Sequence, residues 1–272
     1  MTDDRPVSAP PQLRLYGVRA GLPWVGPAPS AYGGNTACVE LRWGPSRLIF
    51  DAGTGARELS RALLPDAPVI LDLFFSTLRY EHLCGLPFCA AAFNPQNGFR
   101  LHAGGGDGAL EAALEKMMSA PLFPIPRSFL GAVRSLDALA PGERVSLADG
   151  PVVTAFAIDG ATDALAYRIE SATVCLAILG EANSHAPPPP GLLDGADLAL
   201  VAAPADESVP GETGRSWQDA VRYADAAGVR RLVLSHHRCD RDDDALDAIA
   251  AALAQEVPGA TLAREGAMLT LP

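Results

Sequence analysis

Titratable side chains follow one strongly apolar segment of the sequence. Residues 68–75 are almost entirely apolar and rich in strand-forming side chains, which predicts a buried β-strand. Arg79, Glu81 and His82 come soon after it, in and just beyond a polar turn, and an apolar spacing typical of a helix resumes from His82. In α/β folds, ligands and substrates bind at the carboxyl ends of such strands. A carboxylate and an imidazole can hold a metal ion, and a guanidinium can hold an anion, so this segment is the candidate site.

Three further pieces of sequence accompany this segment. Gly-Gly-Asn-Thr at residues 33–36 leads into a predicted strand, and Asp-Ala-Gly-Thr-Gly at residues 51–55 closes another. Residues 230–238 form a predicted strand near whose end His236 and His237 stand. Alone, the glycine-rich piece at residues 51–55 predicts only a tight turn before a helix. It is not a phosphate-binding loop, because no Gly-Lys-Ser/Thr follows.

Together these pieces resemble the metallo-β-lactamase superfamily, in the branch that includes phosphodiesterases and ribonuclease Z-like hydrolases. That branch carries the signature His-x-His-x-Asp-His, then Gly-Leu-Pro-Phe, and the latter stands here at residues 85–88. In this frame the first His falls on Thr77 and the second on Arg79. The Asp falls on Glu81 and the last His on His82. The glycine-rich pieces and the late histidines follow in the same order, so the resemblance runs from about residue 13 to the C-terminus.

The predicted elements alternate as strands, helices, strands and helices in two similar halves. By itself this order predicts an α/β chain in one domain. The resemblance implies more, an α/β (α+β) fold built as a four-layer αββα sandwich. Residues 1–10 are polar and contain proline, which predicts a loose arm, and residues 11–272 are expected to form a single metallo-β-lactamase-like domain. Strands are expected at residues 13–19, 37–43, 47–51, 68–75, 99–103, 145–147, 152–157, 165–170, 173–179, 195–201, 230–238 and 267–271, and helices at 56–64, 109–119, 216–227 and 242–254.

The resemblance implies a site for two metal ions, but the ligands of the first ion are missing. In the family, that ion takes both histidines of His-x-His, a histidine before a Tyr-Arg-Ile-Glu strand, and a bridging aspartate. The corresponding positions here are Thr77, Arg79, the histidine-free loop 159–163 and Gly180. Arginine stays protonated and has no lone pair to donate. A metal ion at this first position is therefore predicted to be excluded.

Most ligands of the second ion are retained. The family takes them from the Asp-His pair, the bridging aspartate and the late histidine. Glu81, His82 and His236 stand at three of these places and are the candidate metal ligands. Two imidazoles and a carboxylate suit one Zn²⁺, Mn²⁺ or Fe²⁺ ion, with a position left for water. Glu181 or His237 is available to complete the set.

Two functions follow from this pattern. In the preferred hypothesis the protein is a non-catalytic pseudoenzyme that binds or regulates without a cofactor, and Arg79 replaces the metal charge and pairs with Glu81. In the alternative, a mononuclear site hydrolyses a phosphodiester or another ester. Glu81 and Asp51, which the resemblance places near the site, are then the candidate catalytic residues. Arg79, Thr77 and Asn35 are the residues expected to contact the ligand or substrate.

Composition excludes several classes of partner. The formal net charge of −11 argues against a nucleic-acid partner and against docking on anionic membranes. No apolar run is long enough for a membrane span, and no apolar segment typical of a signal peptide follows the polar N-terminus, so a cytoplasmic protein is expected. The five cysteines fit buried thiols better than disulfides or a zinc pair. The partner is expected to be an unidentified small molecule or protein. A homodimer stays open, because members of the family often dimerise.

Overall fold

The computed structural model describes residues 10–26, 30–147, 150–180, 186–212 and 214–272. Apart from its last residue, the expected N-terminal arm lies outside this part of the chain, and so does Glu181. The strands are β1 (Gln12–Gly17), β2 (Cys38–Trp43), β3 (Ser46–Phe50), β4 (Ile70–Phe75), β5 (Gly98–Ala103), β6 (Val133–Ala138), β7 (Arg144–Ser146), β8 (Val152–Ala157), β9 (Leu165–Glu170), β10 (Cys175–Leu179), β11 (Leu198–Ala202), β12 (Leu232–Ser235), β13 (Thr261–Leu262) and β14 (Met268–Thr270). The helices are α1 (Ala56–Leu63), α2 (Tyr80–Leu83), α3 (Ala90–Phe93), α4 (Ala109–Met117), α5 (Trp217–Ala226) and α6 (Asp243–Glu256), with 3₁₀ turns η1 (Leu64–Asp66), η2 (Leu86–Phe88) and η3 (Arg127–Phe129).

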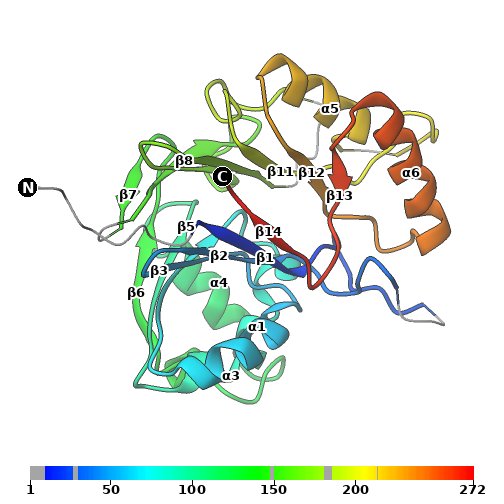
Figure 1. Ribbon diagram of the computed structural model, residues 1–272. Helices are drawn as coiled ribbons and strands as arrows, with labels where there is room; N and C mark the ends of the chain where they lie inside the picture. Colours follow the sequence, from blue (N-terminus) through cyan, green and yellow to red (C-terminus); the bar gives the residue numbers. More distant parts are fainter. Residues whose placement is uncertain (1–9, 27–29, 148–149, 181–185, 213) are drawn as a thin grey trace, which may run out of the picture.

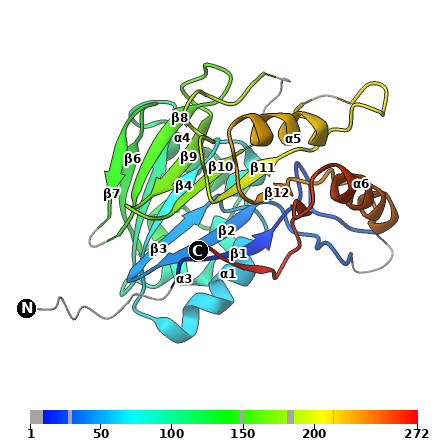
Figure 2. The ribbon, with the colours of Figure 1, turned by 45° about the horizontal axis from the view of Figure 1, so that its top comes forward.

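Within the described residues, the strands form two seven-stranded sheets (Figures 1 and 2). The first has the order β14-β1-β2-β3-β4-β5-β6, and the second the order β13-β12-β11-β10-β9-β8-β7. Neighbouring strands are parallel from β3 to β6 and from β10 to β13. The other pairs are antiparallel. Because the carboxyl ends of neighbouring parallel strands meet at one edge of a sheet, the loops after β3 and β4 lie together, and the loop after β12 meets them from the second sheet.

Three apolar clusters hold the layers together. One lies between the two sheets and includes Phe74 from the first sheet and Tyr167 from the second. Another packs α1, α3 and α4 on the outer face of the first sheet, and the third packs α5 and α6 on the outer face of the second. The same arrangement is visible in Figure 1, where α1, α3 and α4 lie on one side and α5 and α6 on the other. The predicted four-layer αββα sandwich is confirmed.

The sequence of strand β4 is almost wholly apolar because both faces of the strand are covered. Leu71, Leu73 and Phe75 point to the helical layer, whereas Phe74 points between the sheets. Side chains alternate between the two faces of a strand, so a strand covered on both faces reads as a continuous apolar run. At its carboxyl end the chain turns directly into the polar segment that carries the candidate site.

The structure departs from the predicted elements at three places. Strands β6 and β13 were not predicted. The apolar spacing after His82 predicted a helix, and the structure has the short turns α2, η2 and α3 there instead. Pro87, at the start of η2, is the physical reason, because proline has no amide hydrogen to continue a helix.

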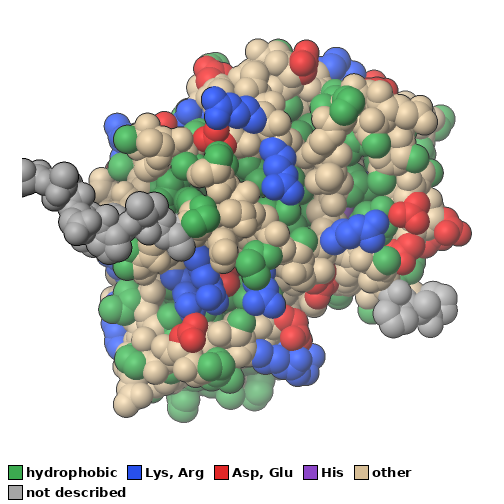
Figure 3. Space-filling model, in the orientation of Figure 1, with side chains coloured by type: hydrophobic (Ala, Val, Ile, Leu, Met, Phe, Trp, Pro, Cys, Tyr) green, Lys and Arg blue, Asp and Glu red, His purple; other side chains and the backbone are tan. Residues whose placement is uncertain are grey.

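The composition led to expectations about surface charge, the state of the cysteines and membrane spans. On the face drawn in Figure 3, basic and acidic side chains are interspersed, with apolar ones between them. All five cysteines are free thiols and four of them are buried. Among the described residues, no helix has both the length and the apolar character needed to cross a membrane.

Candidate functional site

Strand ends bring the candidate residues together. Strand β3 ends directly before Asp51, β4 directly before Ser76, and β12 directly before His236. Asp51, His82 and His236 are all buried, and one donor atom of each lies within 4.8 Å of the others. The rings of His82 and His236 are 5.9 Å apart between centroids and nearly perpendicular, at 81°. Two imidazoles and a carboxylate are thus gathered in one small volume, which we call the Asp51–His82–His236 cluster.

Two of these residues have an unusual backbone conformation. Asp51 and His236 both have φ of +60°, which is uncommon for residues other than glycine. Such a conformation costs about 1–3 kcal/mol, so it persists only where the surroundings hold it. The amide of Asp51 donates to the carbonyl of Phe74 at 2.9 Å, and the amide of His237 donates to Val18 at 2.9 Å. Both strained residues therefore lie at the site itself.

Ser76 links Asp51 to His82. The Ser76 amide donates to Asp51 Oδ1 at 2.8 Å, and its hydroxyl donates to Asp51 Oδ2 at 2.7 Å. The same hydroxyl lies 3.2 Å from His82 Nδ1. Burial raises the pKa of Asp51 to about 6, although the two Ser76 hydrogen bonds oppose the shift. Asp51 therefore titrates close to neutral pH.

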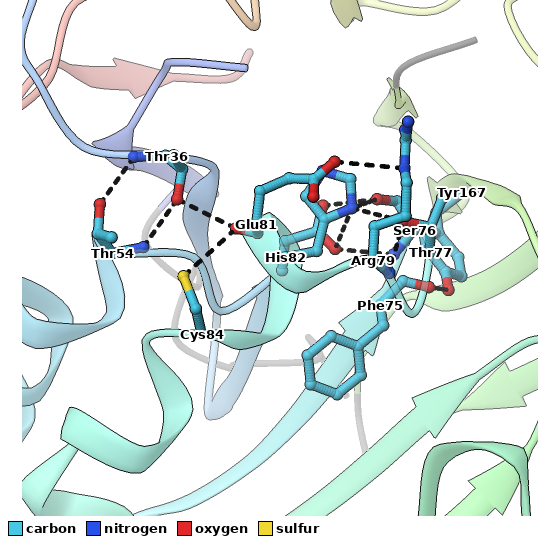
Figure 4. Close-up of polar contacts among 11 residues, drawn as sticks. Thr36, Thr54, Phe75, Ser76, Thr77, Arg79, Glu81, His82, Cys84 and Tyr167 are labelled. Carbon is cyan, nitrogen blue, oxygen red and sulfur yellow. Dashed lines mark hydrogen bonds and ion pairs between the residues drawn. The ribbon is translucent and has the colours of Figure 1, made fainter. Parts of the chain in front are cut away.

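Thr77 links His82 to Arg79 (Figure 4). Thr77 Oγ1 lies 2.7 Å from His82 Nδ1. It also accepts hydrogen bonds from Arg79 N at 3.2 Å and from Arg79 Nε at 3.3 Å. The same Nε lies 3.3 Å from Glu81 Oε1. Arg79 is thus held at the site by a hydroxyl and a carboxylate.

The carboxylate beside the two histidines belongs to Asp51, whereas Glu81 pairs with Arg79. Helix α2, which carries Glu81 and His82, is fixed by its backbone. Thr36 Oγ1 donates to the Glu81 carbonyl at 3.0 Å, and the Ala52 amide donates to the His82 carbonyl at 2.7 Å. Figure 4 shows the Thr36 contact on the side of α2 away from Arg79.

His236 differs from its neighbours because its ring has no hydrogen-bond partner. Both ring nitrogens are buried, and no described residue bonds to either of them. Burial, together with the nearby His82, lowers the pKa of His236 to about 3. It is therefore neutral at pH 7 and offers a lone pair. Buried polar atoms are nearly always satisfied, so an unsatisfied imidazole indicates a site for a ligand, an ion or an ordered water.

Other residues named from the sequence have different surroundings. The side-chain amide of Asn35 donates to Glu265 Oε1 at 2.5 Å. The His237 ring is bonded to the Ala263 carbonyl at 2.8 Å rather than to the cluster. Gly180 does border the site, since a Cβ built on it would lie 3.1 Å from the Ser76 Cβ.

Arg215 was missed by the sequence analysis. It is 1% exposed, and its Nη1 donates to the carbonyls of Gly180 at 3.2 Å and Ala202 at 3.4 Å. Among the described residues no carboxylate forms an ion pair with it, and its Nε has no hydrogen-bond partner. A signal was present in the sequence, because Arg215 directly precedes Ser216, the N-cap of α5, where a positive charge opposes the helix dipole.

Comparison with solved structures identifies the architecture. A diphosphatase of the PhnP family superposes with a TM-score of 0.71 and 18% sequence identity, over 96% of this chain and 98% of that one. The metallo-β-lactamase fold protein YhfI from Bacillus subtilis superposes with a TM-score of 0.71 and 15% identity, over 96% of this chain and 99% of that one. The chain has the metallo-β-lactamase fold. Zn²⁺-bound PqqB from Methylobacterium extorquens shares it, with a TM-score of 0.69 and 17% identity over 96% and 100% of the two chains.

At these identities the comparisons concern the fold alone. No family model matches the chain, and no curated protein sequence matches it either. What this metallo-β-lactamase-fold protein does must therefore be argued from its own side chains. Among the described residues, Asp51, His82 and His236 are the donors gathered closely enough to hold a metal ion, and Arg79 and Arg215 are the nearby cations.

Proposed function

We propose that the protein is a non-catalytic binding protein, built on a hydrolase fold, that holds an anionic small molecule beside Arg79. Arg79 carries this proposal. Thr77 and Glu81 hold its Nε beside the cluster. Its positive charge is close enough to lower the pKa values of both Asp51 and His236. A fixed guanidinium repels a metal ion and attracts a carboxylate or a phosphate, which its planar array of donors fits well.

Arg215 adds a second positive charge at the ends of β10 and β11. Burial lowers its pKa, yet an arginine stays charged in a protein. A buried charge without an ionic partner is costly. The two carbonyls that accept from Arg215 satisfy only part of its donors. Asp159 and Asp219 act on its charge without forming an ion pair, and an anion bound near Gly180 would supply a direct partner.

The hydrogen bonds of Thr77 also favour an anion. Because Thr77 Oγ1 accepts from two N–H groups of Arg79, its own proton is available for His82 Nδ1. His82 then carries its ring proton on Nε2 and acts there as a donor. A donor suits an anion and cannot coordinate a cation.

The expected result is binding of inorganic pyrophosphate, measured by calorimetry with a chelator present throughout. Arg79→Gln should weaken this binding about tenfold or more, because it removes a charge-assisted hydrogen-bond donor. Arg79→Lys should lose less, since it keeps the charge. Arg57→Gln is the matched control, because Arg57 is exposed on α1 and is not among the main charges that act on Asp51 and His236. No binding by the wild type, or equal loss in the Arg57 variant, would reject the proposal.

A second candidate is a mononuclear metal-dependent hydrolase that acts on a phosphodiester or another ester. The unsatisfied ring of His236 favours it, since a neutral, buried imidazole beside a second imidazole and a carboxylate is a typical metal ligand. Asp51, His82 and His236 would hold one divalent ion. A second ion does not fit, because Arg79 and Gly180 offer no donor. When bound, such an ion supplies a water of lowered pKa.

If the protein is this hydrolase, His82 would be the other neutral tautomer, with its ring proton on Nδ1. His82 would donate its Nδ1–H to Ser76 Oγ, which in turn donates to Asp51, and this chain of hydrogen bonds would orient the ring for coordination through Nε2. Arg79 would then hold the anionic group of the substrate. The two candidate functions therefore place the His82 proton on different nitrogens, which ¹⁵N chemical shifts distinguish.

For the hydrolase, elemental analysis after dialysis against Zn²⁺ and then metal-free buffer should find about one ion per chain. His236→Ala should lose the ion, and with it any hydrolysis of bis(p-nitrophenyl) phosphate. His237→Gln is the matched control and should retain the ion, because His237 bonds to Ala263 instead. A wild type that holds no ion after exposure to Zn²⁺ or Mn²⁺ would exclude this candidate.

A further inference from the structure

The segment that supplies Arg79 and His82 also lines a cavity of about 900 Å³. Helix α2 and η2 form one side of it, and α4 with residues 122–123 forms the other. Its size falls within the range of about 300–1,000 Å³ typical of small-molecule pockets. None of the described side chains that line it is acidic, and nearly all are apolar. This lining lacks the carboxylate and imidazole donors of the Asp51–His82–His236 cluster, so it suits an apolar ligand better than a metal ion.

Large apolar side chains are exposed at this cavity. Tyr80 is 67% exposed, Phe88 is 63% exposed and Leu122 is 77% exposed. Phe88 and Phe123 make an edge-to-face contact with ring centroids 5.7 Å apart. Exposed apolar side chains gathered in one concave place, rather than scattered singly, are typical of a binding site.

Among the described side chains that line the cavity, one is a cation, Lys116, which is also the only lysine in the sequence. The carboxylates on its own helix are engaged elsewhere, since Glu111 and Glu115 both pair with Arg127. Among the described residues no carboxylate forms an ion pair with Lys116. An ammonium group beside an apolar cavity selects a ligand that is apolar at one end and anionic at the other.

We propose that this cavity binds a fatty-acid-like amphiphile, with its chain between α2, η2 and α4 and its carboxylate at Lys116. This inference does not depend on the proposed function of the Asp51–His82–His236 cluster. A second copy of the chain fits less well as the occupant. In a two-fold dimer the same surface meets itself, and a lining without any acidic side chain would leave both Lys116 ammonium groups without a partner.

The test compares three amphiphiles of equal chain length, each below its micelle concentration, by calorimetry on the full chain. These are dodecanoate, dodecanol and dodecyltrimethylammonium. Dodecanoate should bind with one site per chain and at least about tenfold more tightly than the cationic amphiphile. The comparison is stringent because the net charge of −11 favours the cation in any non-specific association.

Lys116→Gln should weaken dodecanoate binding about five- to tenfold and leave dodecanol binding unchanged. Lys116 is exposed, so this variant should fold normally. Arg57→Gln, at another exposed helix position, should change neither. Ala113→Phe should fill the cavity and abolish binding of both ligands, with circular dichroism to establish that it is folded.

Three results would overturn the inference. The first is a wild type that binds no dodecanoate, and the second is an equal loss of affinity in the Lys116 and Arg57 variants. The third is a dimer, seen by sedimentation, that Phe88→Glu converts to a monomer, because the cavity would then be a subunit interface.

Discussion

Gly85→Ala is expected to lower the free energy of unfolding by about 3 kcal/mol. A Cβ built on Gly85 would lie 1.8 Å from the carbonyl oxygen of Gly53 and 3.0 Å from that of Ala52. Both contacts are with backbone, which cannot move aside as a flexible side chain can. The Gly85 amide also donates to Ala52 at 2.8 Å, so the two segments are fixed at this distance. With φ of −84°, the position is one that alanine adopts without strain, and the clash alone produces the loss.

Denaturation in urea measures this effect, and Gly98→Ala is the matched control. Gly98 begins β5, and the nearest atom to a Cβ built there is 3.7 Å away. The control should keep wild-type stability or gain slightly, because alanine restricts the unfolded chain. The Gly85 variant should also melt about 6–12 °C lower than the wild type. Equal stabilities of the two variants would contradict the steric argument.

The same substitution should affect the site. Ala52 and Gly53 directly follow Asp51, whose two carboxylate oxygens both accept hydrogen bonds from Ser76. Relief of the clash must push the loop after β3 away from η2, and Asp51 moves with it. Even under conditions in which it is folded, the Gly85 variant should therefore bind pyrophosphate more weakly than the Gly98 variant does.

Much of the site could be predicted from the sequence because its parts stand at strand ends. His82 follows β4 and His236 follows β12, and both strands were recognisable from their apolar residues. The four-layer fold came from several motifs in a fixed order. These are local signals, because each can be read from a short stretch of sequence by itself.

The partners of these residues could not be predicted, because they depend on which strands are neighbours. Glu81 is next to His82 in sequence, and its carboxylate reaches Arg79. Asp51 is 31 positions from His82, but β3 and β4 are adjacent parallel strands, so Asp51 arrives beside it. Arg215 reaches Gly180 in the same way, across the ends of β10 and β11. The short strand β13 has too few residues to show a pattern of its own.

Acid is expected to destabilise the protein, and His237 should account for a large part of the effect. Burial lowers the pKa of His237 from its ordinary 6.5 to about 4. Between these two pH values the unfolded chain binds a proton at this position that the folded protein does not. Stability therefore falls as the pH falls, by about 1.4 kcal/mol per pH unit and by about 3 kcal/mol in all. The contribution is fully present above pH 6.5.

Two other groups of the site act in the same pH range with opposite signs. His236, with its pKa lowered to about 3, adds a loss of the same slope as that of His237. Asp51 opposes them, because its pKa is raised to about 6 from an ordinary 3.8 and the folded protein binds its proton first. Between pH 6 and 4 two histidines therefore act against one carboxylate. These three groups should together leave a net loss of about 1.4 kcal/mol per pH unit as acid is added.

His237→Gln isolates one of these terms. Glutamine does not titrate, and its amide can still donate to the Ala263 carbonyl that His237 Nε2 contacts at 2.8 Å. Urea denaturation at several pH values between 7 and 4 should show a slope reduced by about 1.4 kcal/mol per pH unit. His237→Leu should show the same reduction with lower stability at every pH, because it also leaves that buried carbonyl without its donor. A slope that neither variant changes would mean that His237 gains its proton as readily in the folded protein as in the unfolded chain.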